Sequence, residues 1–150
     1  MTSLADPAFV DQLVTRLGKL HPQRPRAWGR MTPHEMLCHL SDSFQVALGE
    51  RHAAPADTFV QRTVIKYVAL RTSMAWPKGL KTRPEVDQHG GGTKPEDFDR
   101  DRARVIDRMH RFVASSATSG RHPIFGVLTR EEWLIWGYRH TDHHLRQFAL

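Results

Sequence analysis

The sequence predicts an all-α domain, and three observations indicate this class. Apolar residues recur at the three- and four-residue spacing of helices in most of the chain. Residues that cap helices stand before several of these segments, and no segment shows the alternation typical of a strand. The length of 150 residues suits one domain with a real core and is too short for two comfortable ones.

Composition excludes several other classes of protein. With 39% hydrophobic and 25% charged residues, the chain is typical of a globular rather than a disordered protein. No apolar run approaches the roughly eighteen residues that span a bilayer. The N-terminal stretch MTSLADPAFVDQ lacks the basic and apolar regions of a secretory signal. The single cysteine, Cys38, cannot form an internal disulfide. We therefore expect a cytoplasmic protein that does not contact the membrane.

The charge of the chain is unevenly distributed. Residues 51–94 hold eight lysines and arginines against three acids, so this segment carries most of the net charge of +6. An anionic small molecule or a nucleic acid could bind there, although a solvated basic surface is the commoner outcome. The chain has no recognisable DNA-reading motif, and its aromatic residues fall mainly on apolar stripes, which argues against nucleic-acid binding.

Two helices are expected in the first third of the chain. The first runs from Pro7 to Leu20, because Asp6 is a suitable N-cap and proline suits the first helical position. The second opens at Thr32, which forms a capping box with Glu35. In such a box the hydroxyl and the carboxylate each satisfy a free backbone N–H. His34 lies in this first turn, where we expect it to be exposed.

A further helix and a long link should follow. The helix is expected from about Thr58 to Trp76, with an apolar stripe of Phe59, Val64, Val68 and Met74. The link from Trp76 to Asp97 contains three prolines and three consecutive glycines, which predict irregular structure. Links of this length within one domain are usually functional or mobile.

Two more helices complete the chain. One is expected from about Pro95 to Ala117, and the last from Arg130 to Leu150, capped by Thr129. A long link with its own helix fits a four-helix bundle that has one crossover connection. Metal sites in such bundles are built from inward-pointing side chains on facing helices.

The last helix carries an unusual apolar stripe. At about 100° per residue, His140 and His144 share a face with Trp133 and Phe148. Residues four apart on a helix have Cβ atoms about 5–6 Å apart, so two imidazoles can converge on one metal ion. His143 could replace His140 if the helix is rotated. The alternative is two core histidines whose nitrogens are satisfied by polar neighbours.

A third histidine would decide between these alternatives. His39 lies beside the apolar stripe of the second helix, on the same flank as Ser43, and could complete a three-histidine site. Three neutral ligands leave a dipositive centre that can bind water or a thiol and lower its pKa. Gln147 could orient a bound molecule, support a ligand from behind, or be a surface amide. Trp133 is expected in the core or in a pocket wall.

Several motifs resemble a known family. They are WGRMT at Trp28–Thr32, MLCHL at Met36–Leu40, KTRPEVDQ in the link, and HPIFGVLTREEW and YRHTDHHLRQF near the C-terminus. Together they resemble the DinB-like superfamily of metal-binding four-helix bundles, and more narrowly a branch catalogued as a domain of unknown function. The resemblance covers nearly the whole chain, and its C-terminal part is the most specific.

The resemblance implies a particular fold and site. It implies an up-down-down-up bundle that holds a divalent metal, usually zinc or nickel, through three histidines that correspond to His39, His140 and His144. Relatives include transferases and an isomerase that use low-molecular-weight thiols, and the resemblance makes a homodimer plausible, although no feature of the sequence fixes its interface.

Two functions therefore compete. The first is a metal-dependent enzyme acting on a small molecule, either a thiol S-transferase or a hydrolase, although no HExxH glutamate offers a general base. The second is a non-catalytic bundle in which the metal stabilises the fold, or the site is vestigial, and function lies in protein binding.

Overall fold

The chain is mostly helical in the computed structural model, which describes residues 1–116 and 120–150. This confirms the all-α class. The predicted end of one helix at Ala117 lies outside the described residues. The helices are α1 (Pro7–Gly18), α2 (Pro33–Ala47), α3 (Lys66–Arg71), α4 (Phe98–Ala114) and α5 (Arg130–Arg146), with a π-helical segment η1 (Gln61–Ile65) and a 3-10 turn η2 (Pro84–Val86).

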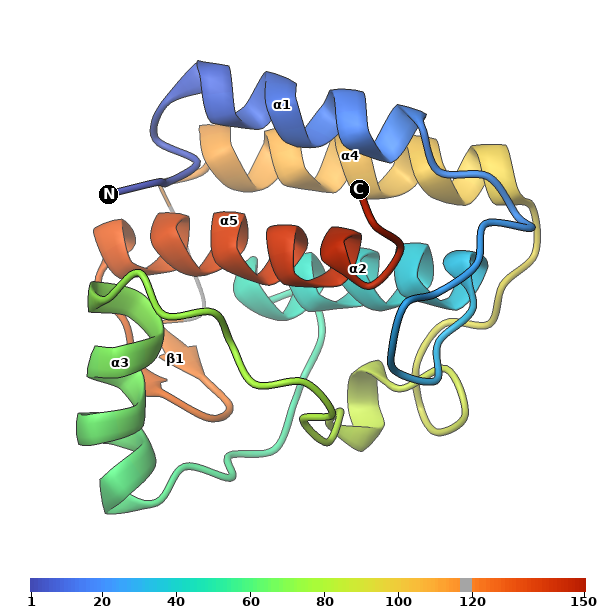
Figure 1. Cartoon of the computed structure of the whole chain (residues 1–150). Helices are drawn as coiled ribbons and strands as arrows, with labels where there is room; N and C mark the ends of the chain where they lie inside the picture. Colours follow the sequence, from blue (N-terminus) through green and yellow to red (C-terminus); the bar gives the residue numbers. More distant parts are fainter. Residues whose placement is uncertain (117–119) are drawn as a thin grey trace.

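Four of the helices lie lengthwise beside one another (Figure 1). In that view α1 and α5 run in one direction and α2 and α4 in the other, while α3 stands across the end where α5 begins. The helix α2 packs on α4, and α1 packs on α5, with further contacts between α2 and α5 and between α1 and α4. Each long helix thus has two long neighbours, and the four surround a shared core.

The core is filled by side chains that are fully buried from water. Leu13 of α1, Met36 of α2, Phe112 of α4 and Trp133 of α5 have no exposed surface. Burying side chains of this size stabilises the fold by about 1.5–3 kcal/mol each. Water exclusion at the centre therefore holds the two helix pairs together.

Close packing of the N-terminal segment requires a glycine on α5. A Cβ at Gly137 would lie 2.7 Å from Leu4 Cδ1 and 3.2 Å from Phe112 Cε1, closer than carbon atoms pack. The backbone N–H of Leu4 also donates to the carbonyl of Leu134, at 3.2 Å. Gly137 therefore allows the first residues of the chain to cover α5.

The predicted helix caps are present. Thr32 and Glu35 form a complete capping box at the start of α2. Thr129 caps α5, where Glu132 completes a second box. These bonds satisfy backbone N–H groups that a helix leaves free. They set where α2 and α5 begin, and so which side chains face the core.

The expected packing of the middle helix is wrong. The helix ends at Arg71 rather than at Trp76, and Phe59, Val64 and Met74 are 72%, 57% and 62% exposed. The physical reason is that η1 is π-helical, with more residues per turn than an α-helix. A stripe projected at the α-helical angle therefore does not mark the face that packs, which is formed instead by buried Ala69 and Leu70.

The helix ends differ from the prediction by up to a turn. The first helix ends at Gly18 rather than Leu20, α4 begins at Phe98 rather than Pro95, and α5 ends at Arg146 rather than Leu150. Past α5, the chain turns at Ala149, which has a φ of 53°. Helix ends fray and are the least certain part of a periodic pattern.

The expectation that the chain contains no strands is also wrong in one place. Two residue pairs form a small antiparallel hairpin, β1 (Arg121–His122) with β2 (Gly126–Val127). Strands of two residues have no periodicity for a sequence pattern to reveal. None of the helices in the described part of the chain is long and apolar enough to cross a membrane.

Candidate metal centre

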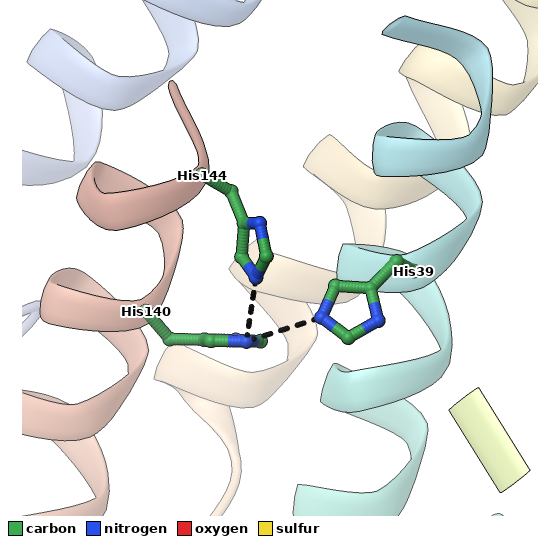
Figure 2. A group of neighbouring side chains, drawn as sticks. All are labelled: His39, His140 and His144. Carbon is green, nitrogen blue, oxygen red and sulfur yellow. Dashed lines mark hydrogen bonds between the residues drawn. The ribbon is translucent and has the colours of Figure 1, made fainter. Parts of the chain in front are cut away.

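Three histidines from two helices meet inside the molecule. Figure 2 shows His39 of α2 pointing toward His140 and His144 of α5. The Nε2 atom of His140 lies 3.2 Å from Nε2 of His39 and 3.1 Å from Nε2 of His144. One nitrogen from each ring lies within 4.8 Å of the others. The structure therefore brings together the three residues that the sequence proposes as ligands.

Two of these rings are held from behind by oxygen acceptors. Nδ1 of His39 donates to the carbonyl of Val86 at 2.8 Å, and Nδ1 of His144 donates to Oε1 of Gln147 at 2.8 Å. A neutral imidazole carries one proton, so Nε2 of each ring bears a lone pair. Both lone pairs are turned toward His140, which has one Nε2 and could donate to only one of them. A cation at the centre would satisfy all three nitrogens.

Burial keeps the three imidazoles neutral. Removal from water lowers the pKa of His39, and lowers the pKa of His140 and His144 well below its ordinary value. Mutual proximity adds to this effect at His140 and His144, because a proton on one ring disfavours a proton on the next. Neutral imidazole is the form that binds metal ions.

A large cavity borders the three histidines. Its volume is about 1040 Å³, at the upper end of the range for sites that bind small organic molecules. His39 and His144 are buried, whereas His140 is half-buried. All four tryptophans of the chain line the cavity, namely Trp28, Trp76, Trp133 and Trp136. A ligand could therefore approach the histidines through an aromatic space.

Two residues named from the sequence lie beside the histidines, and one of them holds a ring. Gln147 is buried and its side-chain oxygen accepts from His144, so it holds a ring in place rather than facing solvent. Ser43 is also buried, and its hydroxyl donates to the carbonyl of His39 at 2.8 Å while lining the cavity. The serine hydroxyl is thus engaged within α2.

Two other named residues lie in the cavity wall. His143 is half-buried and meets Trp28 edge to face, with 4.9 Å between the ring centroids. It does not belong to the group of three ligand atoms. Trp133 is fully buried, and its Nε1–H has no partner among residues 1–116 and 120–150.

Sequence reasoning missed Val86 and His122. Val86 acts through its backbone carbonyl, which no side-chain pattern reveals. His122 lies in the HPIF motif, lines the cavity and is buried in contact with Phe125. The HPIF motif carries part of the resemblance to a family, but no spacing in the sequence gives its histidine a role.

A second group of potential ligand atoms joins α2 to α4. Oδ2 of Asp101 lies 2.8 Å from Nε2 of His34 and 3.8 Å from Sγ of Cys38. Oδ1 accepts from Arg104 at 2.8 Å, and the backbone N–H of Glu96 donates to Oδ2 at 3.2 Å. This carboxylate already has a cationic partner, which favours a hydrogen-bond network over a metal site.

The same network corrects one expectation and fixes one thiol. His34 is half-buried rather than exposed, because it bonds Asp101 and packs on Phe98 at 5.4 Å. Burial, followed by the charge of Asp101, raises the pKa of the Cys38 thiol to about 12. The thiol is therefore protonated at neutral pH, and Cys38 acts as a packing residue.

Fold and site together define a helical domain with three converging histidines beside an aromatic cavity. The chain belongs to the family described as "Protein of unknown function (DUF1569)", whose model matches residues 8–150. Comparison with curated proteins and with solved structures found no match. The match confirms the expectation of a domain of unknown function, and the family's description names no activity.

Proposed function

We propose that this chain is a divalent-metal protein of the DinB-like type, in which His39, His140 and His144 hold one ion through their Nε2 atoms. The observation that carries this proposal is that the Nδ1 protons of two of these rings point away from the centre, toward oxygen acceptors. Val86 and Gln147 accept the Nδ1 protons of His39 and His144, which leaves two lone pairs turned toward the third ring. Metal-bound histidines are held in this way, with the other nitrogen donating to an oxygen.

The helix arrangement supports the same family of folds. The paired directions of α1 with α5 and of α2 with α4 fit an up-down-down-up bundle (Figure 1). The long connection between α2 and α4, which contains η1, α3 and η2, supplies the crossover that such a bundle needs. In this arrangement the ligands come from the facing helices α2 and α5.

The three side chains suit zinc or nickel. Imidazole nitrogen is a good ligand for both, and three neutral ligands leave the full positive charge of the ion at the site. A bound ion would supply Lewis acidity, lowering the pKa of a water or thiol beside it. The chain contributes the rest: Gln147 and Val86 fix the ring directions, and the aromatic cavity holds the organic part of a substrate.

Among reactions, transfer to a low-molecular-weight thiol is better supported than hydrolysis. The described lining of the cavity contains one carboxylate, Asp87, and Arg30 already pairs with it. A general base for water is thus missing there, whereas a thiol, with an ordinary pKa of about 8.5, would release its proton to solvent beside a bound ion without a protein base. Lys81 also lines the cavity and would attract an anionic thiol.

The alternative is a non-catalytic, metal-stabilised bundle that binds protein, and one observation favours it. The segment around η1 exposes Phe59, Val64 and Tyr67 at 72%, 57% and 63%. A second copy of this chain could cover these side chains in a homodimer. Sedimentation over a range of concentrations should then show a dimer that Tyr67→Ser weakens, and a monomer at every concentration would contradict the dimer.

Metal content tests the site directly. Purified protein equilibrated with zinc or nickel and then desalted should retain about one ion per chain, since three fixed ligands are expected to hold it tightly. His144→Ala should lose most of it. His110→Ala is the matched control, because this histidine is exposed on α4, away from the site. Zero metal in the wild type, or full retention by His144→Ala, would contradict the proposal.

Turnover separates the enzyme from the alternative. The metal-loaded protein should be incubated with cysteine or glutathione and an aromatic electrophile. The proposed reaction predicts saturable turnover that is lost after chelation and in His144→Ala. Metal that stabilises the fold without turnover over a broad panel of thiols would favour the non-catalytic bundle.

A further inference from the structure

The strongest unassigned feature is His122, a histidine that belongs to the cavity wall and not to the metal cluster. It lies on β1 and is 7% exposed. Its ring stacks on Phe125 with 4.6 Å between centroids, and meets Trp133 and Trp136 at 5.5 and 5.4 Å. Trp136 also stacks on His140, with 5.0 Å between the ring centroids. His122 and the candidate ligand thus contact the same tryptophan.

The hairpin turn fixes the proton of His122. Its Nδ1 accepts from the backbone N–H groups of Ile124 and Phe125, at 3.1 and 3.2 Å. A nitrogen that accepts two hydrogen bonds cannot carry a proton, so the neutral ring carries its proton on Nε2. Burial agrees with this state, because it lowers the pKa of His122 to about 3. The ring is therefore a neutral donor throughout the range in which the protein is expected to work.

The donor of His122 lacks an acceptor. Its Nε2 forms no hydrogen bond within residues 1–116 and 120–150, and the Nε1 of neighbouring Trp133 likewise has no partner there. Nε1 of Trp133 is inaccessible to solvent, whereas Nε2 of His122 is not among the inaccessible side-chain atoms that lack a partner. The open space that His122 borders is the cavity. Buried donors in folded proteins nearly always have an acceptor, from protein or from water, and the oxygen of a bound molecule would fill this role in the cavity.

We propose that the cavity takes a largely aromatic or apolar molecule bearing a carbonyl or carboxylate oxygen, and that His122 binds this oxygen through Nε2–H. The walls favour a ring system, since they include all four tryptophans and Phe125. Of the cationic residues in the lining, Arg30 pairs with Asp87 and Arg83 with Glu85, so Lys81 is the cation that best suits a carboxylate. The inference rests on the proposed function for the reaction, but the binding step needs only the cavity and His122.

The test uses three ligands of similar shape on the full chain, freed of metal with a chelator. They are 2-acetylnaphthalene, 2-naphthoate and 2-isopropylnaphthalene, of which the last has no acceptor. Equilibrium dialysis gives the affinities, and tryptophan emission reports occupancy, because every tryptophan of the chain lines the cavity. Removing metal separates this test from the test of the metal centre.

The decisive quantity is the ratio of ketone affinity to hydrocarbon affinity. His122→Phe should lower this ratio about fivefold, the equivalent of one net hydrogen bond, while hydrocarbon binding changes less than about twofold. His122→Gln, which keeps an N–H donor, should recover part of the ratio. The same comparison with naphthoate shows whether a carboxylate is preferred to a carbonyl. An unchanged ratio in His122→Phe, or no binding of any of the three ligands to the wild type, would overturn the inference.

A second measurement avoids substitution, because His122→Phe also removes the acceptor of two backbone N–H groups. In the unchanged chain, the side-chain Nε2–H resonance of His122 should move downfield when the ketone binds and stay in place when the hydrocarbon binds. A resonance that does not move at saturating ketone would overturn the inference even if metal binding is demonstrated. If the resonance moves with the ketone in a protein that binds no metal, the inference about His122 is supported and the metal proposal fails.

Discussion

Replacing Gln147 by leucine removes the acceptor that holds His144 in place. The bond from Nδ1 of His144 to Oε1 of Gln147 is 2.8 Å long, and both residues are 7% exposed, so water cannot readily replace the lost oxygen. Without it, the His144 ring can rotate and its Nδ1–H is left unsatisfied. Loss of such a supporting partner typically weakens metal binding about 10- to 100-fold. This range corresponds to about 1.4–2.8 kcal/mol of binding free energy.

Competition with a chromophoric chelator at pH 7.5 measures this change as the zinc dissociation constant of each variant. Gln147→Glu is the matched control, because it keeps an oxygen acceptor and should bind zinc at least as tightly as the wild type. Thermal unfolding of the metal-free proteins checks that both variants fold. A folded Gln147→Leu variant with an affinity within about twofold of the wild type would refute the argument from the Nδ1 protons.

Three further predictions concern stability. The metal-free protein should lose stability as the pH falls below 6.5. In the unfolded chain His122 binds a proton in this range, whereas in the folded protein its pKa of about 3 keeps the ring neutral. Between pH 7.5 and 5 this residue alone should cost about 2 kcal/mol, and urea titrations showing a flat profile would contradict it. Gly137→Ala should lower the free energy of unfolding by about 1–3 kcal/mol, because the new Cβ overlaps Leu4, and should therefore lower the melting temperature. An unchanged melting temperature would mean that the N-terminal segment moves aside at no cost. Asp101→Asn should cost about 1.5–3 kcal/mol in urea unfolding, since it weakens charge-assisted bonds to Arg104 and His34, and an equally stable variant would show that the network is not structural.

Local rules carried most of what the sequence predicts correctly. The caps at Thr32 and Thr129 fix the start of α2 and α5, and helical spacing then fixes which side chains face inward. Four-residue spacing puts His140 and His144 on one face, and contact between α2 and α5 brings His39 to them. The caps and the four-residue spacing depend on short-range geometry, whereas the contact between α2 and α5 was expected from the resemblance to a four-helix bundle.

Features that depend on long-range or backbone contacts could not be predicted. The carbonyl of Val86 reaches His39 only because the long link folds back on α2, and no residue type marks this. The π-helical register of η1 changes which side chains are exposed, so the stripe with Phe59 was misassigned. The donor state of His122 depends on backbone N–H groups in a two-residue hairpin, which leaves no periodic signal.

X-ray absorption at the metal edge of zinc- or nickel-loaded protein tests the central claim most directly. The account predicts scattering from three imidazole rings with metal–nitrogen distances of about 2.0–2.1 Å, and one ring fewer in His144→Ala. A spectrum with fewer than three imidazoles in the wild type, or one that His144→Ala leaves unchanged, would contradict it.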